Sequence, residues 1–106
     1  YAYGIDNTDN SNSGTTLFAD DVTVLATEAS NDNFAVFHIG FPSTTITRAT
    51  LEGDDLSVIN AGGPGPVEIS NSRFITPSPG PGQTWQGTMT CTAVSRSTVF
   101  AGSGCP

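Results

Sequence analysis

His38 is the only histidine of the sequence, and its surroundings decide whether the chain could perform acid–base chemistry. A histidine base works with a nucleophile and an orienting carboxylate, which usually occur in recognisable motifs. The sequence contains no Gly-x-Ser-x-Gly motif, no Cys-x-x-Cys motif and no histidine cluster. His38 lies between Phe37 and Ile39 in the most hydrophobic stretch of the chain. We therefore interpret it as a structural side chain of a strand.

The other candidates for acid–base catalysis are two pairs of adjacent carboxylates, Asp20-Asp21 and Asp54-Asp55. Neighbouring residues of a strand point to opposite faces, so an adjacent pair is poorly placed to act on one substrate. The second pair follows Glu52-Gly53, and aspartate is typical of such a tight turn for backbone reasons. We predict no catalytic residue and no enzymatic activity.

Oxygen-bearing side chains from Asp9 to Asp20 are spaced like those of an EF-hand loop, with Gly14 at the glycine position. However, Ser11 and Ser13 replace carboxylates, the bidentate glutamate is missing, and no flanking helix is expected. Two interpretations remain, a calcium site and an irregular arm rich in Asp, Asn and Ser. We favour the arm and predict no metal site and no cofactor.

The two cysteines, Cys91 and Cys105, lie close together near the end of the sequence. One such pair is a poor metal site, whereas a disulfide is typical of proteins in oxidising compartments. Closing this short loop would stabilise the fold by about 3 kcal/mol. We predict a Cys91–Cys105 disulfide and an extracellular or cell-surface protein that is periplasmic before assembly, with any leader already removed.

The overall charge excludes several classes of partner. The net charge is −7, lysine is absent, and the three arginines are scattered along the chain. Binding to nucleic acid or to an anionic membrane needs clustered cations, so we expect neither. No apolar run approaches the roughly 18 residues that span a bilayer, and we expect no direct insertion into a membrane.

With 106 residues, fifteen threonines and twelve glycines, the sequence is typical of a single β-domain. We expect an irregular N-terminal arm at 1–16 and a β core at 17–106, and we find no internal repeat of useful length. Alternating stretches predict a hairpin of 22–26 with 34–41, a second hairpin of 44–51 with 56–59, and a strand at 83–93. An alternative for 20–29 is a helix capped by Asp20 or Asp21, but valine and threonine favour a strand.

The C-terminal pattern resembles that of type IV pilins, whose heads are antiparallel sheets closed by a C-terminal disulfide. Trp85 precedes Cys91 by a few residues and Cys105 is almost terminal, as in several pilins. The stretch 21–40 is similar to the first hairpin of bacterial pilin heads. The resemblance implies an all-β fold with a pilin-head-like antiparallel sheet, and a small β-sandwich is the alternative.

The sequence lacks the long hydrophobic helix of a pilin between Tyr1 and Asp21. In the split pilins of metal-reducing bacteria, that helix belongs to a separate short chain on which a globular chain docks. The resemblance therefore implies a globular subunit that binds a short helical pilin chain and neighbouring filament subunits. Apolar residues expected to share the sheet face would form the interface with the helix: Ala35, Phe37, Ile39, Phe41, Trp85 and Met89.

We expect this chain to be a structural subunit of an extracellular pilus-like filament. A closed β-sandwich that covers its own apolar face is the competing hypothesis. It would suit a secreted binding module that binds carbohydrate through Trp85 or inhibits another protein through the loop 77–82. A small secreted enzyme centred on His38 is a third hypothesis.

Overall fold

The computed structural model describes residues 2–9, 15–27, 30, 32–75, 84–96, 99–100 and 104–106. These residues form short strands joined by turns, and none of them is in a helix, so no helix there could cross a membrane. The strands are β1 (Ala2–Asp9), β2 (Thr16–Asp20), β3 (Thr23–Ala26), β4 (Asn33–Gly40), β5 (Ser43–Thr47), β6 (Thr50–Gly53), β7 (Leu56–Asn60), β8 (Val67–Ser70), β9 (Arg73–Ile75), β10 (Trp85–Gln86), β11 (Thr90–Thr92), β12 (Ser95–Arg96) and β13 (Val99–Phe100).

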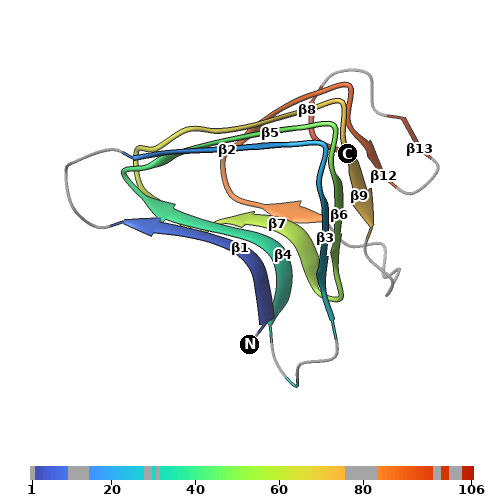
Figure 1. The fold of residues 1–106 in the computed structure, drawn as a ribbon, viewed down its shortest axis with the longest axis horizontal. Helices are drawn as coiled ribbons and strands as arrows, with labels where there is room; N and C mark the ends of the chain where they lie inside the picture. Colours follow the sequence, from blue (N-terminus) through green and yellow to red (C-terminus); the bar gives the residue numbers. More distant parts are fainter. Residues whose placement is uncertain are drawn as a thin grey trace.

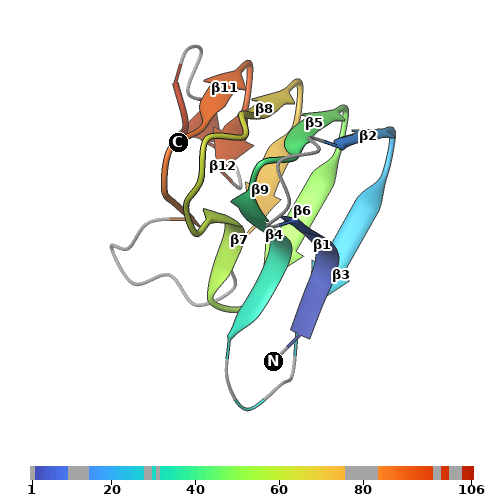
Figure 2. The same cartoon turned by 90° about the vertical axis from the view of Figure 1, so that its left-hand side faces the viewer.

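The strands build a solenoid in which each turn of the chain contributes one strand to each of three sheets (Figure 1). The sheets have the orders β1-β4-β7-β10, β11-β8-β5-β2 and β13-β12-β9-β6-β3. Figure 2 shows the successive strands of each sheet side by side, from the first coil in blue to the last in orange. Every pairing is parallel except that of β12 with β13. The described strands therefore form a parallel β-helix of four coils.

The predicted antiparallel sheet, and with it the pilin-head-like or β-sandwich fold class, is wrong. Strand β3 pairs with β6 and not with the following β4, and β6 pairs with β3 and β9 and not with β7. The two predicted hairpins are therefore absent. Parallel pairing needs a long connection between partners, and here the remaining strands of the coil provide it. The predicted strand at 83–93 is divided into β10 and β11, which belong to different sheets.

Two further expectations concern the N-terminal region. Residues Ala2–Asp9 are not an irregular arm, because they form β1 and pair with β4 along its length. Residues Thr23–Ala26 are a strand, which agrees with the choice of strand over helix for this segment. Part of the candidate calcium loop, residues 10–14, lies outside the described residues.

The core consists of rows of apolar side chains that run along the axis of the solenoid. Register places Ala19 beside Ile46, Ile46 beside Ile69, and Ile69 beside Cys91. A second row contains Val24, Leu51 and Phe74. Leu51, Ile46, Ile69 and Phe74 are completely or almost completely buried, and burial of each such side chain contributes about 1.5–3 kcal/mol. Each coil therefore depends on its neighbours for much of its buried surface.

One residue with positive φ turns each coil between its second and third strands. These residues are Asp21, Arg48, Asn71 and Ala93, with φ values of 57°, 49°, 50° and 54°. The amide nitrogens of the first three donate to the carbonyl oxygens of Thr47, Ser70 and Thr92 in the next coil, at 2.9–3.1 Å. Each corner is thus a residue in the left-handed conformation, and the corners of successive coils lie in register. Most side chains disfavour this conformation.

Candidate interaction surface at the first coil

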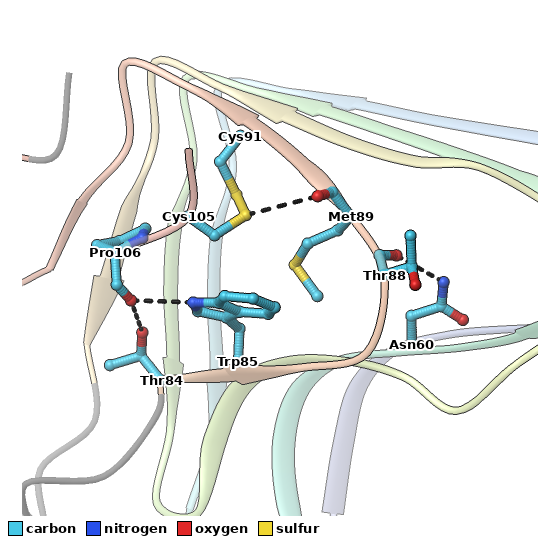
Figure 3. The surroundings of a disulfide bond; sticks show 8 residues. All are labelled: Asn60, Thr84, Trp85, Thr88, Met89, Cys91, Cys105 and Pro106. Carbon is cyan, nitrogen blue, oxygen red and sulfur yellow. Dashed lines mark hydrogen bonds between the residues drawn. A yellow bond between two sulfur atoms is a disulfide. The ribbon is translucent and has the colours of Figure 1, made fainter. Parts of the chain in front are cut away.

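The two ends of the solenoid differ, and the C-terminal end is closed by the tail of the chain (Figure 3). The side chains of Thr84 and Trp85 both donate to the carbonyl oxygen of Pro106, each at 3.0 Å. The amide of Gly104 donates to the carbonyl oxygen of Cys91 at 3.2 Å. The tail therefore lies against the last coil and supplies hydrogen-bond acceptors and apolar contacts there.

The predicted disulfide between Cys91 and Cys105 is confirmed, with the two Cα atoms 4.8 Å apart. Cys91 is buried in the core, so the bond links the tail directly to the interior of the last coil. The sulfur of Cys105 also lies 3.9 Å from the carbonyl oxygen of Met89. Trp85 and Met89 are half-buried and pack against the core beside this bond.

The first coil forms the opposite end of the described solenoid, and among the described strands each of its three strands pairs on one side only. Among the described residues, four large hydrophobic side chains are exposed. Three of them belong to this coil, one on each strand: Tyr3 on β1, Phe18 on β2 and Leu25 on β3, with exposed fractions of 37%, 65% and 61%. The fourth, Phe41, follows β4 and is 40% exposed. Three free strand edges and three exposed apolar side chains thus coincide at one end.

An aromatic stack begins at this end of the solenoid. The ring of Tyr3 is nearly parallel to those of Phe34 and Phe37, with centroid distances of 5.7 and 4.7 Å. Phe34 is buried and Phe37 is half-buried, whereas Tyr3 is exposed. The stack therefore includes an exposed ring on β1, which is the edge strand among the described strands of its sheet.

The first coil is acidic. It carries Asp6, Asp9, Asp20 and Asp21, and no lysine or arginine occurs before Arg48. The guanidinium group of Arg48, in the second coil, forms a salt bridge with Asp20. Hydrogen bonds from Arg48 and from the hydroxyl of Thr47 lower the pKa of the Asp20 carboxyl to about 2. The Asp20 carboxylate is therefore ionised at neutral pH, and its charge is balanced by that of Arg48.

His38, the one candidate base, is completely buried within a polar corner of the interior. Its Nδ1 lies 2.9 Å from the hydroxyl oxygen of Thr44, which also accepts a hydrogen bond from the side-chain amide of Asn7 at 2.8 Å. Its Nε2 has no hydrogen-bond partner of good geometry among the described residues. Burial lowers the pKa of His38, and the backbone of Gly65 opposes this shift in part. The ring is neutral and inaccessible, so it is not placed to act on a substrate.

A shallow hollow of about 270 Å³ lies on the sheet that contains β5, β8 and β11. Register aligns Thr45, Glu68 and Thr90 across it, with Ser70 and Thr92 in the next row. Glu68 is the only ionisable residue of its lining. Glu68 has no second carboxylate and no histidine beside it in this lining, so the hollow lacks the paired carboxylates of a glycosidase-like site. No group of three or more His, Cys, Asp or Glu side chains placed to bind a metal ion occurs among the described residues.

The structure does not bring the residues predicted to bind a helix onto one surface. Ala35 is fully buried, and Trp85 packs against the core at the far end of the solenoid. Phe37 and Ile39 are half-buried, on the side of β4 opposite His38. Phe41 is exposed beyond the end of β4, and Met89 lies between β10 and β11. The predicted interface is thus divided between the second and the last coils.

Comparison of the chain with protein-family models, with curated proteins and with solved structures finds no match. The fold and the disulfide define its class, which is a parallel β-helix with one end closed by a covalently linked tail.

Sequence analysis missed the residues of the open end, Tyr3, Phe18 and Leu25. Tyr3 was assigned to the irregular arm at 1–16, and Phe18 lies between that arm and the strand predicted at 22–26. Only Leu25 belonged to a predicted strand, in which it appeared to be an ordinary member of a half-buried strand. What distinguishes these residues is their place in the sheets, because each is the first described residue of its row of aligned side chains. Phe18, for example, begins the row that continues through Thr45, Glu68 and Thr90.

Proposed function

We propose that this chain is a structural, non-enzymatic module of an extracellular assembly and that it docks on a neighbouring subunit through its first coil. The observation that carries the proposal is the difference between the two ends of the solenoid. Exposed apolar side chains beside free strand edges are typical of a surface that another segment or subunit covers. Here the tail covers the last coil, whereas the first coil presents Tyr3, Phe18 and Leu25.

The short helical pilin chain stays a prediction. A parallel β-helix differs from the pilin head that the resemblance implied, so we base the proposal on the ends of the solenoid instead. The disulfide favours an oxidising compartment, which agrees with an extracellular location.

Replacing Phe18 and Leu25 with serine tests the proposed docking end. Both side chains are exposed, so the double variant is expected to keep its fold and to change the melting temperature little. We expect it to lose at least about tenfold in incorporation into the extracellular assembly, because apolar anchors dominate the stability of interfaces. The measurement is the fraction of the chain that sediments with extracellular material from the producing cells.

Phe41→Ser is the matched control, because Phe41 is exposed but lies outside the first coil. It is expected to sediment like the unmodified chain. Equal incorporation of the double variant and the unmodified chain would exclude docking through the first coil, and a loss confined to Phe41→Ser would favour a partner on the other side of the solenoid.

A further inference from the structure

The hydrogen bonds around His38 determine which of its ring nitrogens carries the proton. The side-chain nitrogen of Asn7 lies 3.1 Å from the carbonyl oxygen of Ser43, which can only accept, so the NH₂ group of Asn7 faces it. The same nitrogen donates to the hydroxyl oxygen of Thr44 at 2.8 Å. Thr44 is completely buried, and Nδ1 of His38, at 2.9 Å, is the one acceptor beside its hydroxyl group among the described residues. The hydroxyl group therefore donates to Nδ1, and the proton of the neutral ring is on Nε2.

The Nε2 atom is the one buried side-chain nitrogen or oxygen without a partner in the part of the chain that the structure describes. The backbone of Gly65 raises the pKa of His38, as a carbonyl oxygen that faces an N–H group does. Because Nδ1 already contacts Thr44, the Gly65 carbonyl acts on the Nε2 side of the ring. The neutral ring thus links the start of β5 to the connection between β7 and β8.

A second proton on the ring does not fit this arrangement. It would bind Nδ1, so that an N–H group and the hydroxyl group of Thr44 would both be donors to each other. The hydroxyl group has no other acceptor among the described residues to which it could turn. The residues in register with His38, Asn7 and Asn60, carry no charge that would compensate the imidazolium ion.

Few titratable groups occur on the elements around the ring. On the inward side of β1 the titratable residue is Asp9, which pairs with Gly40, two residues beyond His38. The inward sides of β5, β7 and β8 carry none, and neither do the connections 41–42 and 61–66. An effect of Asp9 would occur at a lower pH, since an aspartate ordinarily titrates near pH 4 and a histidine near pH 6.5.

The connections 41–42, between β4 and β5, and 61–66, between β7 and β8, are in backbone contact. The amide of Gly65 donates to the carbonyl oxygen of Gly40 at 3.0 Å, and the amide of Gly40 donates to that of Gly62 at 2.8 Å. A Cβ atom at Gly65 would lie 1.7 Å from the carbonyl oxygen of Pro42. Water can therefore reach this side of His38 only when the two connections separate.

The connection 61–66 has space into which it can move. A hollow of about 250 Å³ lies beside it, lined by Gly63–Pro66 on one side and by Thr88–Thr90 on the other. Gly62, near the start of the connection, has a φ of 132°, and a Cβ atom there would meet nothing within 4 Å. A glycine in open space changes its backbone angles readily, so Gly62 is suited to act as a hinge.

We propose that His38 is a proton-operated switch of the connections 41–42 and 61–66. The neutral ring, with its proton on Nε2, keeps the two connections together. Uptake of a proton from water at Nδ1 separates them locally, while the other coils stay folded. The switch is independent of docking through the first coil, and it would make this part of the surface respond to acidification around the protein.

Nitrogen NMR of the unmodified chain at about pH 7.5 tests the assigned tautomer. We expect an Nδ1 signal of a nitrogen without a proton and an Nε2 signal of a protonated one. Thr44→Ser keeps the hydroxyl group and should keep these signals, whereas Thr44→Val should give a mixture of both tautomers. A ring protonated on Nδ1 in the unmodified chain would overturn the proposal, because a second proton would then enter at Nε2 without opposing Thr44.

Amide exchange at about pH 7.5 and about pH 5, corrected for its intrinsic pH dependence, tests the local opening. The amides of Gly40, Ala61 and Gly65 bond across the two connections and should lose protection at least about tenfold at the lower pH. The amides of Asn71 and Ser95 lie at another corner and should change little. An equal loss of protection at both groups of amides would contradict a local switch.

His38→Asn is the variant that removes the switch. Its amides at Gly40, Ala61 and Gly65 should have the same protection at both pH values. A loss of protection at the lower pH that persists in this variant would assign the effect to another group, such as Asp9, and would overturn the proposal. If the variant does not fold, the tautomer signals and the amide exchange of the unmodified chain and of Thr44→Ser still decide the question.

Discussion

His38 is a buried base that has no charged partner among the polar groups it contacts, and its titration should make stability depend on pH. Its neighbours in register are Asn7 and Asn60, and its Nδ1 contacts the hydroxyl of Thr44. Burial holds the pKa of His38 below its usual value of 6.5. The unfolded chain therefore binds a proton at a pH where the folded chain does not. The contribution of neutral His38 to the free energy of unfolding is complete above pH 6.5. It is lost as the pH falls from 6.5 through the lower pKa that His38 has in the folded state.

Replacing His38 with Asn is expected to remove this pH dependence. Asn is chosen because Asn7 and Asn60 already occupy the positions on either side, so the variant places three amides in one row. The unmodified chain should lose stability between pH 6.5 and 5 with a slope of at most about 1.4 kcal/mol per pH unit, the value for uptake of one proton. Urea unfolding at several pH values measures the slope.

The matched control is Thr44→Val, which removes the hydroxyl beside Nδ1 while keeping the histidine. It is expected to lower stability by about 1–3 kcal/mol, because the side-chain amide of Asn7 keeps only the carbonyl oxygen of Ser43 as an acceptor and Nδ1 of His38 loses its partner. The free energy of unfolding of this variant should still decrease as the pH falls below 6.5. An identical pH dependence of His38→Asn and the unmodified chain would show that the slope arises from other groups.

At the scale of the element, one corner position has a left-handed conformation in every coil, although quite different residues occupy it. Asn tolerates positive φ better than most residues, whereas Ala93 and Arg48 have no such preference. Ala93→Asn is expected to stabilise the fold by about 0.5–1 kcal/mol, because the strain of a left-handed alanine is partly relieved. The reverse change at the preceding corner, Asn71→Ala, should destabilise it by a similar amount.

Thermal unfolding checks these two variants, and we expect their melting temperatures to shift in opposite directions by roughly 4 °C each. Asn71→Gly is the control, because glycine accepts this conformation without strain and should cost less than alanine. Destabilisation by Ala93→Asn would mean that the corner of the last coil depends on a contact of Ala93 and not on its backbone conformation.

These corners also show what sequence analysis could predict and what it could not. Alternation in 22–26 and 34–41 correctly indicated strands, and the cysteines indicated the disulfide. The stretch 44–51, expected to be one strand, is divided into β5 and β6, which belong to different sheets. Segments of one pattern begin at Leu17, Thr44, Val67 and Met89, and they occupy the same place in successive coils. They were not recognised as a repeat because only the alternation is shared, while the residue at the corner and the length of the connections vary.

Strand pairing could not be predicted for a related reason. Alternation indicates which side of a strand is buried, but it is the same for a strand that pairs with the next strand along the chain and for one that pairs a full coil later. The predicted interaction residues were affected in turn. Phe37 and Trp85 were assigned to one sheet face on the assumption of antiparallel pairing, whereas the solenoid places them in the second and the last coils.

At the scale of the whole molecule, the solenoid is a stack in which each coil packs chiefly against the coils beside it. The stability of such a stack is approximately a sum of local terms, and a capped end opens less readily than an uncapped one. Strands β10, β11 and β12 lie under a tail linked by the disulfide, whereas β1, β2 and β3 have free edges. We therefore expect amide exchange to be fastest in the first coil and slowest in the middle coils.

Reduction of the disulfide tests whether the end is capped locally. Loss of the Cys91–Cys105 bond is expected to destabilise the folded state by about 3 kcal/mol, which corresponds to about a hundredfold faster exchange where the bond limits opening. If the tail caps only its own end, this acceleration is confined to β10, β11 and β12, and the rates in β1, β2 and β3 change little. Hydrogen exchange followed by mass spectrometry, before and after reduction, measures both regions in one sample. The variant with Cys91→Ser and Cys105→Ser controls for effects of the reductant. An equal acceleration in the first and last coils would instead show that the four coils open as one cooperative unit, and that the two ends differ in surface but not in stability.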